Sequence, residues 1–192
     1  MLQETSGGDK TNGAASLEEG ILKGTTVMRD VATTKGGKAN TESVIGLLND
    51  ALATEVICIL RYKRHYFMTT EISARHVKAK FLQHVIEERA HADQLVDRII
   101  QLGGKPDLSP ERLLTRSHAE LIEGESLVEM ITADLFAERV AIDGYRGMIT
   151  SIGSNDPTTQ QVLERILAQE EAHAESLAGL LREGALTRTV SI

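Results

Sequence analysis

Four long segments carry apolar residues at steps of three and four positions, and this periodicity is the feature that most constrains the fold. The segments cover residues 41–69, 73–102, 123–152 and 157–183. Residues spaced in this way share one face of an α-helix, so each segment predicts an amphipathic helix with one buried side. Asp156 and Pro157 predict the start of the last helix, because Asp is a favoured N-cap and Pro is favoured at the first helical position. Aromatic residues make up only 3% of the chain, which argues against a β-rich fold and indicates the all-α class.

The connections between these segments predict their topology. Short links near residues 70 and 154 join the helices into two hairpins, and Gly103-Gly104 ends the second helix. Residues 104–122 form a long connection that contains two of the three prolines, with room for a short turn of helix. A 28-residue helix is about 42 Å long, a distance that roughly 13 extended residues can cover. The connection can therefore run the length of the molecule, which predicts a four-helix bundle with one long crossover between helices 2 and 3.

Composition divides the chain into three parts. Residues 1–39 are rich in Gly, Thr and Ser and predict a flexible N-terminal extension, within which Ser16–Glu19 reads as a capping box that indicates either a docking helix or a frayed linker. Residues 40–184 are expected to form the bundle and residues 185–192 a C-terminal tail.

The single Cys58 and the absence of a signal pattern indicate a cytoplasmic protein. No apolar run approaches the roughly 18 residues needed to cross a bilayer, which indicates a soluble protein with no membrane contact. A net charge of -7 argues against a general nucleic-acid surface.

An internal repeat relates the two hairpins. The second and fourth segments both read E-x-A-H-A-(D/E)-x-L, with Glu88 and His91 in one and Glu170 and His173 in the other. The first and third segments each place a Glu on an otherwise apolar stripe, and these residues, Glu55 and Glu138, are separated in the sequence by almost the same interval as the two motifs. Two hairpins related by pseudo-twofold symmetry bring all six side chains to one level of the core.

Such a cluster requires cations. Several ionised carboxylates in an apolar core are very costly unless they are neutralised. A Glu and a His at positions i and i+3 share a helical face and can ligate one metal, and four carboxylates balance two divalent ions. Oxygen-rich ligation with one imidazole per metal suits iron, or alternatively manganese, better than a thiol-rich zinc site. The pattern therefore predicts a two-metal carboxylate centre.

Residues 41–183 resemble the bacterioferritin branch of the ferritin-like superfamily. The matching residues are Glu55, Tyr62, His65, Glu88, His91, Asp134, Glu138, Glu170 and His173. The resemblance implies that Glu55 and Glu138 are terminal ligands, that Glu88 and Glu170 bridge, and that His91 and His173 each bind one metal. It places Tyr62 beside the centre.

The resemblance also implies an activity. Members of this branch oxidise Fe(II) with O₂ or H₂O₂ at two iron ions per subunit and store Fe(III) inside a homo-oligomeric shell, here of 12 or 24 subunits. Arg89 stands where bacterioferritins carry a haem-ligating Met, so haem is not predicted. Gln83 stands where relatives carry an iron-binding His on the inner surface, and His84 is expected one step off that face.

Two other functions fit the same scaffold. One is a DNA-protecting Dps-like protein, although a Dps builds its iron site across a subunit interface and this chain supplies all six ligands itself. The other is a non-storage enzyme such as a rubrerythrin-type peroxidase or a manganese catalase. A rubrerythrin adds a Cys-rich iron module, which one cysteine cannot build.

The remaining polar residues near the repeat have structural interpretations. Tyr145 is expected to be a core aromatic with a satisfied hydroxyl, whereas Tyr62 could be that or a neighbour of the centre. His65 is interpreted as a structural hydrogen bonder, and Cys58 as a small buried apolar residue. The expected surface residues are His76 and His118, the cluster Arg61-Lys63-Arg64 on a solvated or subunit-contact face, and Glu87 and Glu171 on a solvated face or in interhelical ion pairs.

Overall fold

The computed structural model describes residues 41–119, 121–122 and 124–189, with side chains as far as residue 183. The possible helix at Ser16–Glu19 and all of the expected extension, residues 1–39, lie outside these residues. Within them the chain forms helices and their connections, and the predicted all-α class is confirmed. The long helices are α2 (Thr41–Met68), α3 (Arg75–Gln101), α5 (Leu127–Ile152) and α6 (Pro157–Thr189). The shorter ones are η1 (Ile72–Ala74), α4 (Pro110–Arg116) and η2 (Gly153–Asn155).

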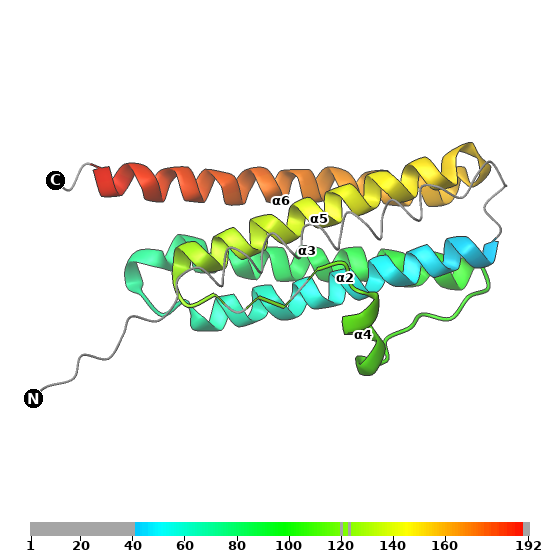
Figure 1. Ribbon diagram of the computed structural model, residues 1–192, viewed down its shortest axis with the longest axis horizontal. Helices are drawn as coiled ribbons and strands as arrows, with labels where there is room; N and C mark the ends of the chain where they lie inside the picture. Colours follow the sequence, from blue (N-terminus) through cyan, green and yellow to red (C-terminus); the bar gives the residue numbers. More distant parts are fainter. Residues whose placement is uncertain (1–40, 120, 123, 190–192) are drawn as a thin grey trace, which may run out of the picture.

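The four long helices form a bundle of two hairpins joined by one long crossover, as predicted (Figure 1). In one hairpin α2 packs on α3, in the other α5 packs on α6, and α2 also contacts α5 while α3 contacts α6. Figure 1 shows that α3 and α5 run in the same direction and that the connection between them returns along the bundle. The short helix α4 lies in this connection and packs against α2.

Local side-chain chemistry sets the helix ends. Gly104 N donates to Ile99 O and Gly103 N to Ile100 O, both at 2.9 Å, and Gly103 has a φ of 79°, which is the glycine-terminated helix end predicted for this pair. A Cβ atom on Gly104 would lie 2.8 Å from Ile45 Cγ2, so this glycine also allows the connection to approach α2. At α6, Thr159 N donates to the predicted cap Asp156 Oδ1 at 3.0 Å.

Two helix boundaries differ from the prediction. Helix α5 begins at Leu127 rather than near residue 123, because Ser126 and Glu129 form a reciprocal capping box. Ser126 Oγ accepts from Glu129 N at 3.2 Å, and Glu129 Oε2 accepts from Ser126 N at 3.0 Å. Helix α6 continues to Thr189, past the expected end near residue 183.

The buried apolar residues form two main clusters that flank a polar layer. One cluster packs residues that precede Glu55 on α2 and follow His91 on α3, including Leu48, Leu52, Leu95 and Ile99. The other packs residues on the opposite side of that level, including Tyr62, Phe81, Ile131 and Leu177. Burial of each large apolar side chain contributes about 1.5–3 kcal/mol. Apolar contacts therefore hold the helices together on both sides of the level at which the acidic residues meet.

Helix α2 has a higher mean hydropathy than the length of its uninterrupted apolar runs indicated. An 18-residue window of it has a mean hydropathy of 1.7, so among the described residues it is the one helix long and apolar enough to cross a membrane by length and composition. Single polar residues such as Glu55 interrupt its apolar runs without lowering this average. Because 56% of the window is buried inside the bundle, we interpret α2 as a core helix.

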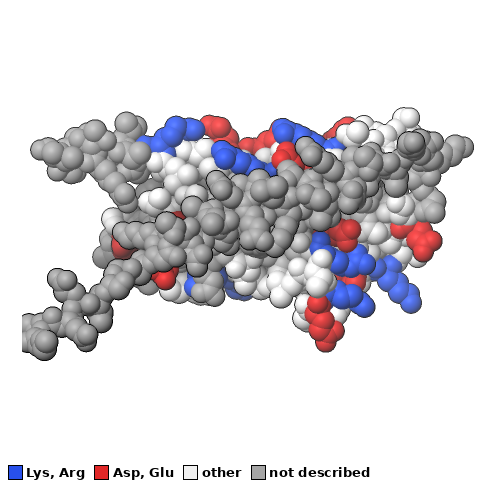
Figure 2. All heavy atoms as spheres, viewed as in Figure 1, with Lys and Arg blue, Asp and Glu red and all other residues white. Residues whose placement is uncertain are grey.

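Surface ion pairs hold the crossover in place. Arg116 Nη1 lies 2.7 Å from Asp50 Oδ1 on α2 and joins the crossover to the bundle, and within the crossover Arg112 Nε lies 2.7 Å from Asp107 Oδ2. Figure 2 shows acidic and basic side chains intermixed around α4 and along α6. Exposed pairs of this kind contribute less than about 1 kcal/mol each, so they orient the connection more than they stabilise the fold.

The expectation that Arg61 lies on a solvated face is wrong. Its side chain is 0% exposed, and its Nε donates to Asp134 Oδ1 at 2.8 Å. His65 Nδ1 lies 2.9 Å from the second oxygen of Asp134, which confirms His65 as a structural hydrogen bonder. Lys63 is exposed and Arg64 partly so. Position 61 faces α5, where Asp134 supplies the opposite charge that makes burial of a guanidinium tolerable.

Candidate metal centre

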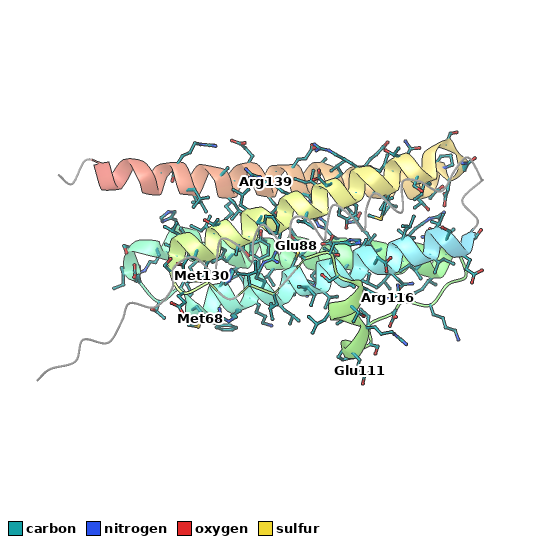
Figure 3. All side chains as sticks on the ribbon, in the orientation of Figure 1. Met68, Glu88, Glu111, Arg116, Met130 and Arg139 are labelled. Atoms are coloured by element: carbon teal, nitrogen blue, oxygen red, sulfur yellow. The ribbon has the colours of Figure 1, made fainter. Side chains whose placement is uncertain are left out.

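The six residues singled out by the repeat meet in the middle of the bundle. Each long helix contributes to the cluster, and Figure 3 shows Glu88 between the helices near the centre of the molecule. All six side chains are buried, none of the residues being more than 5% exposed. They are Glu55 on α2, Glu88 and His91 on α3, Glu138 on α5, and Glu170 and His173 on α6.

One half of the cluster is grouped around His91, and we call it the first subsite. His91 Nδ1 lies 3.0 Å from Glu170 Oε1, 3.4 Å from Glu88 Oε2 and 3.5 Å from Glu55 Oε2. One donor atom from each of these four residues lies within 4.8 Å of the other three. The first subsite is therefore three carboxylates and one imidazole around a common point.

The other half is grouped around His173, and we call it the second subsite. His173 Nδ1 lies 3.2 Å from Glu88 Oε1, 3.2 Å from Glu170 Oε2 and 3.7 Å from Glu138 Oε2. Donor atoms of these four residues also lie within 4.8 Å of one another. The second subsite repeats the chemistry of the first.

Glu88 and Glu170 belong to both subsites. Each turns one carboxylate oxygen towards His91 and the other towards His173. Glu55 belongs only to the first subsite, and Glu138 only to the second. This division has the form that the resemblance implies, with two shared and two terminal carboxylates.

Two tyrosines hold the terminal carboxylates from the opposite hairpin. The Tyr62 hydroxyl on α2 donates to Glu138 Oε1 on α5, and the Tyr145 hydroxyl on α5 donates to Glu55 Oε1 on α2. Tyr62 thus contacts the cluster, and Tyr145 is the satisfied core aromatic that was predicted. The contact of Tyr145 with Glu55 was not predicted, although Tyr62 and Tyr145 are separated by the same interval as Glu55 and Glu138, which could have indicated it.

A polar side chain outside the cluster orients each imidazole. His91 Nε2 lies 3.1 Å from Gln169 Oε1, and His173 Nε2 lies 2.9 Å from Glu87 Oε2. Such partners fix the ring orientation and leave the other nitrogen, here Nδ1, to face the centre. Glu87 therefore forms one of the predicted interhelical pairs, and Glu171 forms another with Arg146 at 2.6 Å.

Burial and mutual repulsion favour protons on two of the four carboxyl groups. Burial, and next the charge of Glu88, raises the pKa of Glu55 to about 8. Burial, and next the charge of Glu55, raises the pKa of Glu170 to about 8. Burial acts in the same direction on Glu138, but hydrogen bonding to His173 outweighs it and lowers the pKa of Glu138 to about 2.

Both imidazoles also favour the protonated form when the metal is absent. Burial alone would lower the pKa of His91, but hydrogen bonding to Glu170 and the other carboxylates raises it well above its ordinary value. Burial would also lower the pKa of His173, but hydrogen bonding to Glu138 and the other carboxylates outweighs burial and raises this pKa to about 12. In the absence of metal, protons provide the positive charge that the buried carboxylates require.

His84 lies against the second subsite. As expected, it lies off the face of the exposed Gln83, but the sequence interpretation did not place it beside the centre. Its ring stacks on His173 with centroids 4.2 Å apart. Steps of four and three residues along α3 separate His84 from Glu88 and Glu88 from His91, so all three share one face. This spacing was the signal that could have placed His84 at the centre. Burial, and next the charge of His173, lowers the pKa of His84 to about 4.

The other singled-out residues are not members of the groups that could hold a metal. Cys58 is buried as predicted, and burial raises the pKa of its thiol. His76 is exposed as predicted. His118 is only partly exposed, because its backbone nitrogen donates to Thr54 Oγ1 on α2 at 3.0 Å and holds the segment against the bundle. Arg89 is exposed on α3.

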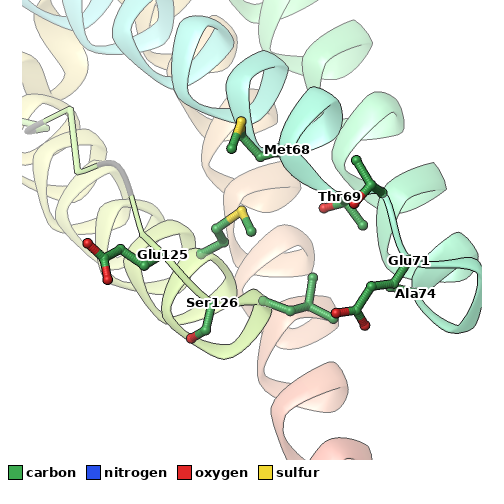
Figure 4. Close-up of a pocket in the computed structure, with 9 residues that line it drawn as sticks. Met68, Thr69, Glu71, Ala74, Glu125 and Ser126 are labelled. Atoms are coloured by element: carbon green, nitrogen blue, oxygen red, sulfur yellow. The ribbon is translucent and has the colours of Figure 1, made fainter.

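A pocket of about 370 Å³ lies apart from the cluster, at the end of the bundle. It is bounded by the C-terminal end of α2, the η1 turn and the start of α5 (Figure 4). Glu71 and Glu125 are among the residues that line it, and none of the six clustered residues does. The groups of side chains that could hold a metal therefore lie inside the bundle rather than in this pocket.

The donor atoms of the cluster fit two metal ions. Seven buried side-chain atoms form no hydrogen bond of regular geometry among the described residues, and six of them belong to the cluster, where they face one another as charge pairs. They are Glu55 Oε2, Glu88 Oε1, both Glu170 oxygens, and Nδ1 of His91 and His173. Burial of charged atoms with imperfect hydrogen bonds is costly, and ligation would remove that cost. Carboxylate-rich donor sets with one imidazole per ion suit iron or manganese.

A four-helix bundle with one long crossover and this arrangement of Glu and Glu-x-x-His residues is a ferritin-like carboxylate protein. The comparison with known families agrees: the model of the ferritin-like domain matches residues 45–187, and the chain belongs to the ferritin-like family.

Sequence relatives point to one branch of the family. The chain is 33% identical to bacterioferritin of Brucella melitensis over 140 residues, which cover 70% of this chain and 80% of the relative. It is 33% identical to bacterioferritin of Streptomyces coelicolor over 135 residues, covering 70% and 77% of the two chains. The predicted resemblance to bacterioferritins is therefore confirmed.

Solved structures show the same fold. The dodecameric thioferritin of Bacteroides fragilis, described as a bacterioferritin-related protein, superposes with a TM-score of 0.76 at 27% identity, covering 84% of this chain and 98% of that one. Dps from Thermosynechococcus elongatus gives a TM-score of 0.71 at 21% identity, covering 76% and 95%. The second likeness is one of fold alone.

Proposed function

We propose that this protein is a ferroxidase and iron-storage protein that oxidises Fe(II) at the six-residue centre and holds Fe(III) in an oligomeric shell. The observation that supports it most is the split of the two shared carboxylates between His91 and His173. It creates two adjacent subsites for divalent ions in a site that contains four carboxylates. The sequence relatives named bacterioferritin support the same class of activity.

The chemistry requires two iron ions as substrate. Each Fe(II) gives up one electron, and O₂ or H₂O₂ takes both electrons together with two protons. The protein holds the two ions at neighbouring positions through Glu88 and Glu170. Tyr62 and Tyr145 fix the terminal carboxylates by hydrogen bonds, and Gln169 and Glu87 fix the imidazoles. The apolar clusters on both sides exclude bulk water.

The proposal includes neither haem nor general DNA binding. Arg89, an exposed cation, stands at the position of the haem-ligating Met. All six candidate ligands come from one chain, whereas a Dps builds its site between subunits. A gel-shift assay with plasmid DNA tests the alternative role in DNA protection. The assay compares the full chain with a variant that lacks residues 1–39, and retardation of the DNA that depends on these residues would support that role. The cytoplasmic location stays a prediction.

We expect the assembled protein to form a particle of 12 or 24 copies. Large apolar side chains are exposed on α2 and α3, including Phe67 at 62% and Ile86 at 60%, and such surface is typical of subunit contacts. With a chain mass of 20.9 kDa, the particle should have a mass of about 250 or 500 kDa, consistent with closed symmetric assembly. Size-exclusion chromatography with light scattering and iron analysis tests this. A dimer to hexamer that retains no iron beyond two ions per chain would instead favour a non-storage peroxidase or catalase.

Metal binding should release protons. At pH 7 the metal-free centre holds protons on both imidazoles and on Glu55 and Glu170, and ligation requires all four groups to be deprotonated. We expect roughly two to four protons per centre to be released when two divalent ions bind. As the pH rises through 8, the two carboxyl groups lose their protons before the metal binds, so the number released should fall and the apparent affinity should rise.

Anaerobic calorimetric titration with Fe(II) in two buffers of different ionisation enthalpy measures this number. The control is the variant Glu175→Ala, which removes an exposed carboxylate of α6 and should release the same number. If binding of two ions releases no protons, the assigned protonation of the centre is wrong.

A further inference from the structure

The two subsites are related by the internal repeat, but they are not identical, and the first difference lies at His84. The sequence offset that relates Glu88 to Glu170 and His91 to His173 also relates His84 to Ile166. Ile166 is a fully buried member of an apolar cluster. The two halves therefore differ at this position, with an imidazole in one and a hydrocarbon side chain in the other.

His84 has the contacts of a metal ligand rather than of a surface histidine. It is 1% exposed, and its Nδ1 atom has no hydrogen-bond partner among the residues that the structure describes. One ring nitrogen of His84 lies within 4.8 Å of donor atoms of both Glu138 and His173. A buried ring nitrogen without a partner carries an energetic cost that ligation of a metal would remove.

Neighbouring groups hold the His84 ring against the second subsite. The ring stacks on His173 with an interplanar angle of 19°, and because the lone pairs of two stacked imidazoles do not converge, binding of one ion by both rings requires the His84 ring to rotate out of this stack. Its edge-to-face contact with Tyr62 has centroids 4.9 Å apart. The Tyr62 hydroxyl also donates to Glu138. The three residues near His84, which are Tyr62, Glu138 and His173, therefore also organise the second subsite.

We propose that His84 is a further nitrogen ligand of the second subsite and makes the two metal positions unequal. This inference rests on the proposed two-metal centre. The first subsite offers three carboxylates and one imidazole, whereas the second offers three carboxylates and two imidazoles. Imidazole favours Co²⁺ and Zn²⁺ over ions that prefer oxygen ligands alone. The second subsite should therefore bind these ions first and more tightly.

The outer partners of the imidazoles strengthen the same difference. His173 is held by the carboxylate of Glu87, and His91 is held by the neutral amide of Gln169, at positions again related by the repeat offset. A carboxylate partner makes an imidazole a stronger ligand than an amide partner does. Both departures from symmetry therefore favour the second subsite.

Titration of the metal-free, assembled protein with Co²⁺ under anaerobic conditions tests the proposal, because Co²⁺ absorption reports ligand number and type without requiring iron oxidation. The unmodified protein should bind two Co²⁺ ions in two distinguishable steps. In His84→Ile, which installs the residue found at the symmetric position, the tighter step should weaken about ten- to a hundredfold, the range seen when the partners of metal ligands are removed. Its absorption bands should change with it.

Two further variants make the result decisive. His84→Gln keeps a polar side chain of similar size and, if His84→Ile does not assemble, provides the same test. His76→Ala removes an exposed histidine near the start of α3 and should leave both steps unchanged.

The outcomes separate this inference from the proposed function. If two Co²⁺ ions bind and neither their affinities nor their spectra respond to replacement of His84, then His84 only packs against His173 and the inference is overturned. If the unmodified protein binds no pair of ions, the two-metal centre fails, and the inference fails with it. If the unmodified protein binds both ions with equal affinity, only the inequality is refuted.

Discussion

Replacing Glu88 by alanine is expected to abolish rapid Fe(II) oxidation. Glu88 presents one oxygen to each half of the cluster, at 3.4 Å from His91 Nδ1 and 3.2 Å from His173 Nδ1. Its loss removes a ligand from both subsites and breaks the link that keeps two ions adjacent. We expect the initial rate of ferric absorbance in stopped-flow mixing to fall about a hundredfold or more, because changes that act only indirectly on a metal already cost 10–100-fold.

His173→Ala should produce a loss of similar size by a different route. It removes the His173 imidazole from the second subsite and leaves the first subsite intact, so one ion per chain should still bind. Because transfer of two electrons requires both ions, oxidation should nevertheless be slow. Counting bound metal alongside the rate distinguishes the two variants: Glu88→Ala should weaken binding at both positions and His173→Ala at one.

The controls for these variants address folding and charge. Glu88→Gln keeps the volume of the side chain and removes its charge, so it should oxidise iron as slowly as Glu88→Ala without leaving a cavity. Glu175→Ala removes an exposed carboxylate from α6 and should oxidise iron at the original rate. Circular dichroism and size-exclusion chromatography should show helical, assembled protein in every case. If Glu88→Ala and His173→Ala both keep the original rate, the centre has been assigned to the wrong residues.

The helices and the six clustered residues were predictable because both depend on local spacing. Residues three and four positions apart share a helical face whatever the tertiary structure, so Glu88 with His91 and Glu170 with His173 could be assigned to one face each. The nearly equal sequence intervals between corresponding residues of the two hairpins then placed both halves of the cluster at one level of the bundle. Glu55 and Glu138 followed from being the acidic residues on otherwise apolar stripes.

The errors arose where a side chain's surroundings depend on another helix. Arg61 belongs to a cluster of basic residues that reads as a solvated surface, and nothing local to α2 indicates that Asp134 faces it from α5. The place of His84 beside the centre was missed for a different reason: it was compared only with the position of an iron-binding residue in relatives, and its spacing from Glu88 was not considered. Helix α6 continues past residue 183 and through Gly184, although Gly often follows the end of a helix, and no Gly or Pro marks its end at Thr189.

The buried network of Arg61, Asp134 and His65 predicts the largest effect on stability. Asp134 accepts from Arg61 Nε at 2.8 Å and contacts His65 Nδ1 at 2.9 Å, and all three residues are 0% exposed. Asp134→Ala leaves the guanidinium of Arg61 in the core without this carboxylate. Loss of one partner of a buried pair costs about 3–5 kcal/mol. For a chain of this size the melting temperature should fall by roughly 6–20 °C.

Thermal denaturation of the metal-free protein at one fixed concentration measures this shift, because assembly makes the melting temperature depend on concentration. Asp143→Ala is the matched control, since Asp143 also lies on α5 but its side chain is 62% exposed; it should change the melting temperature by little. A fall in Asp134→Ala no larger than in Asp143→Ala would show that the buried pair contributes little.

A double variant distinguishes two contributions to stability: the cost of burying the Arg61 guanidinium without the Asp134 carboxylate, and the net contribution of the ion pair. Arg61→Met with Asp134→Leu replaces both charges by apolar side chains, and such replacements are often neutral or stabilising. We expect the double variant to recover most of the melting temperature lost in Asp134→Ala. If it does, the desolvated guanidinium causes the loss, and the ion pair is not required for stability. If it instead melts as low as the single variant, the ion pair and its contact with His65 make a net contribution that apolar packing cannot replace.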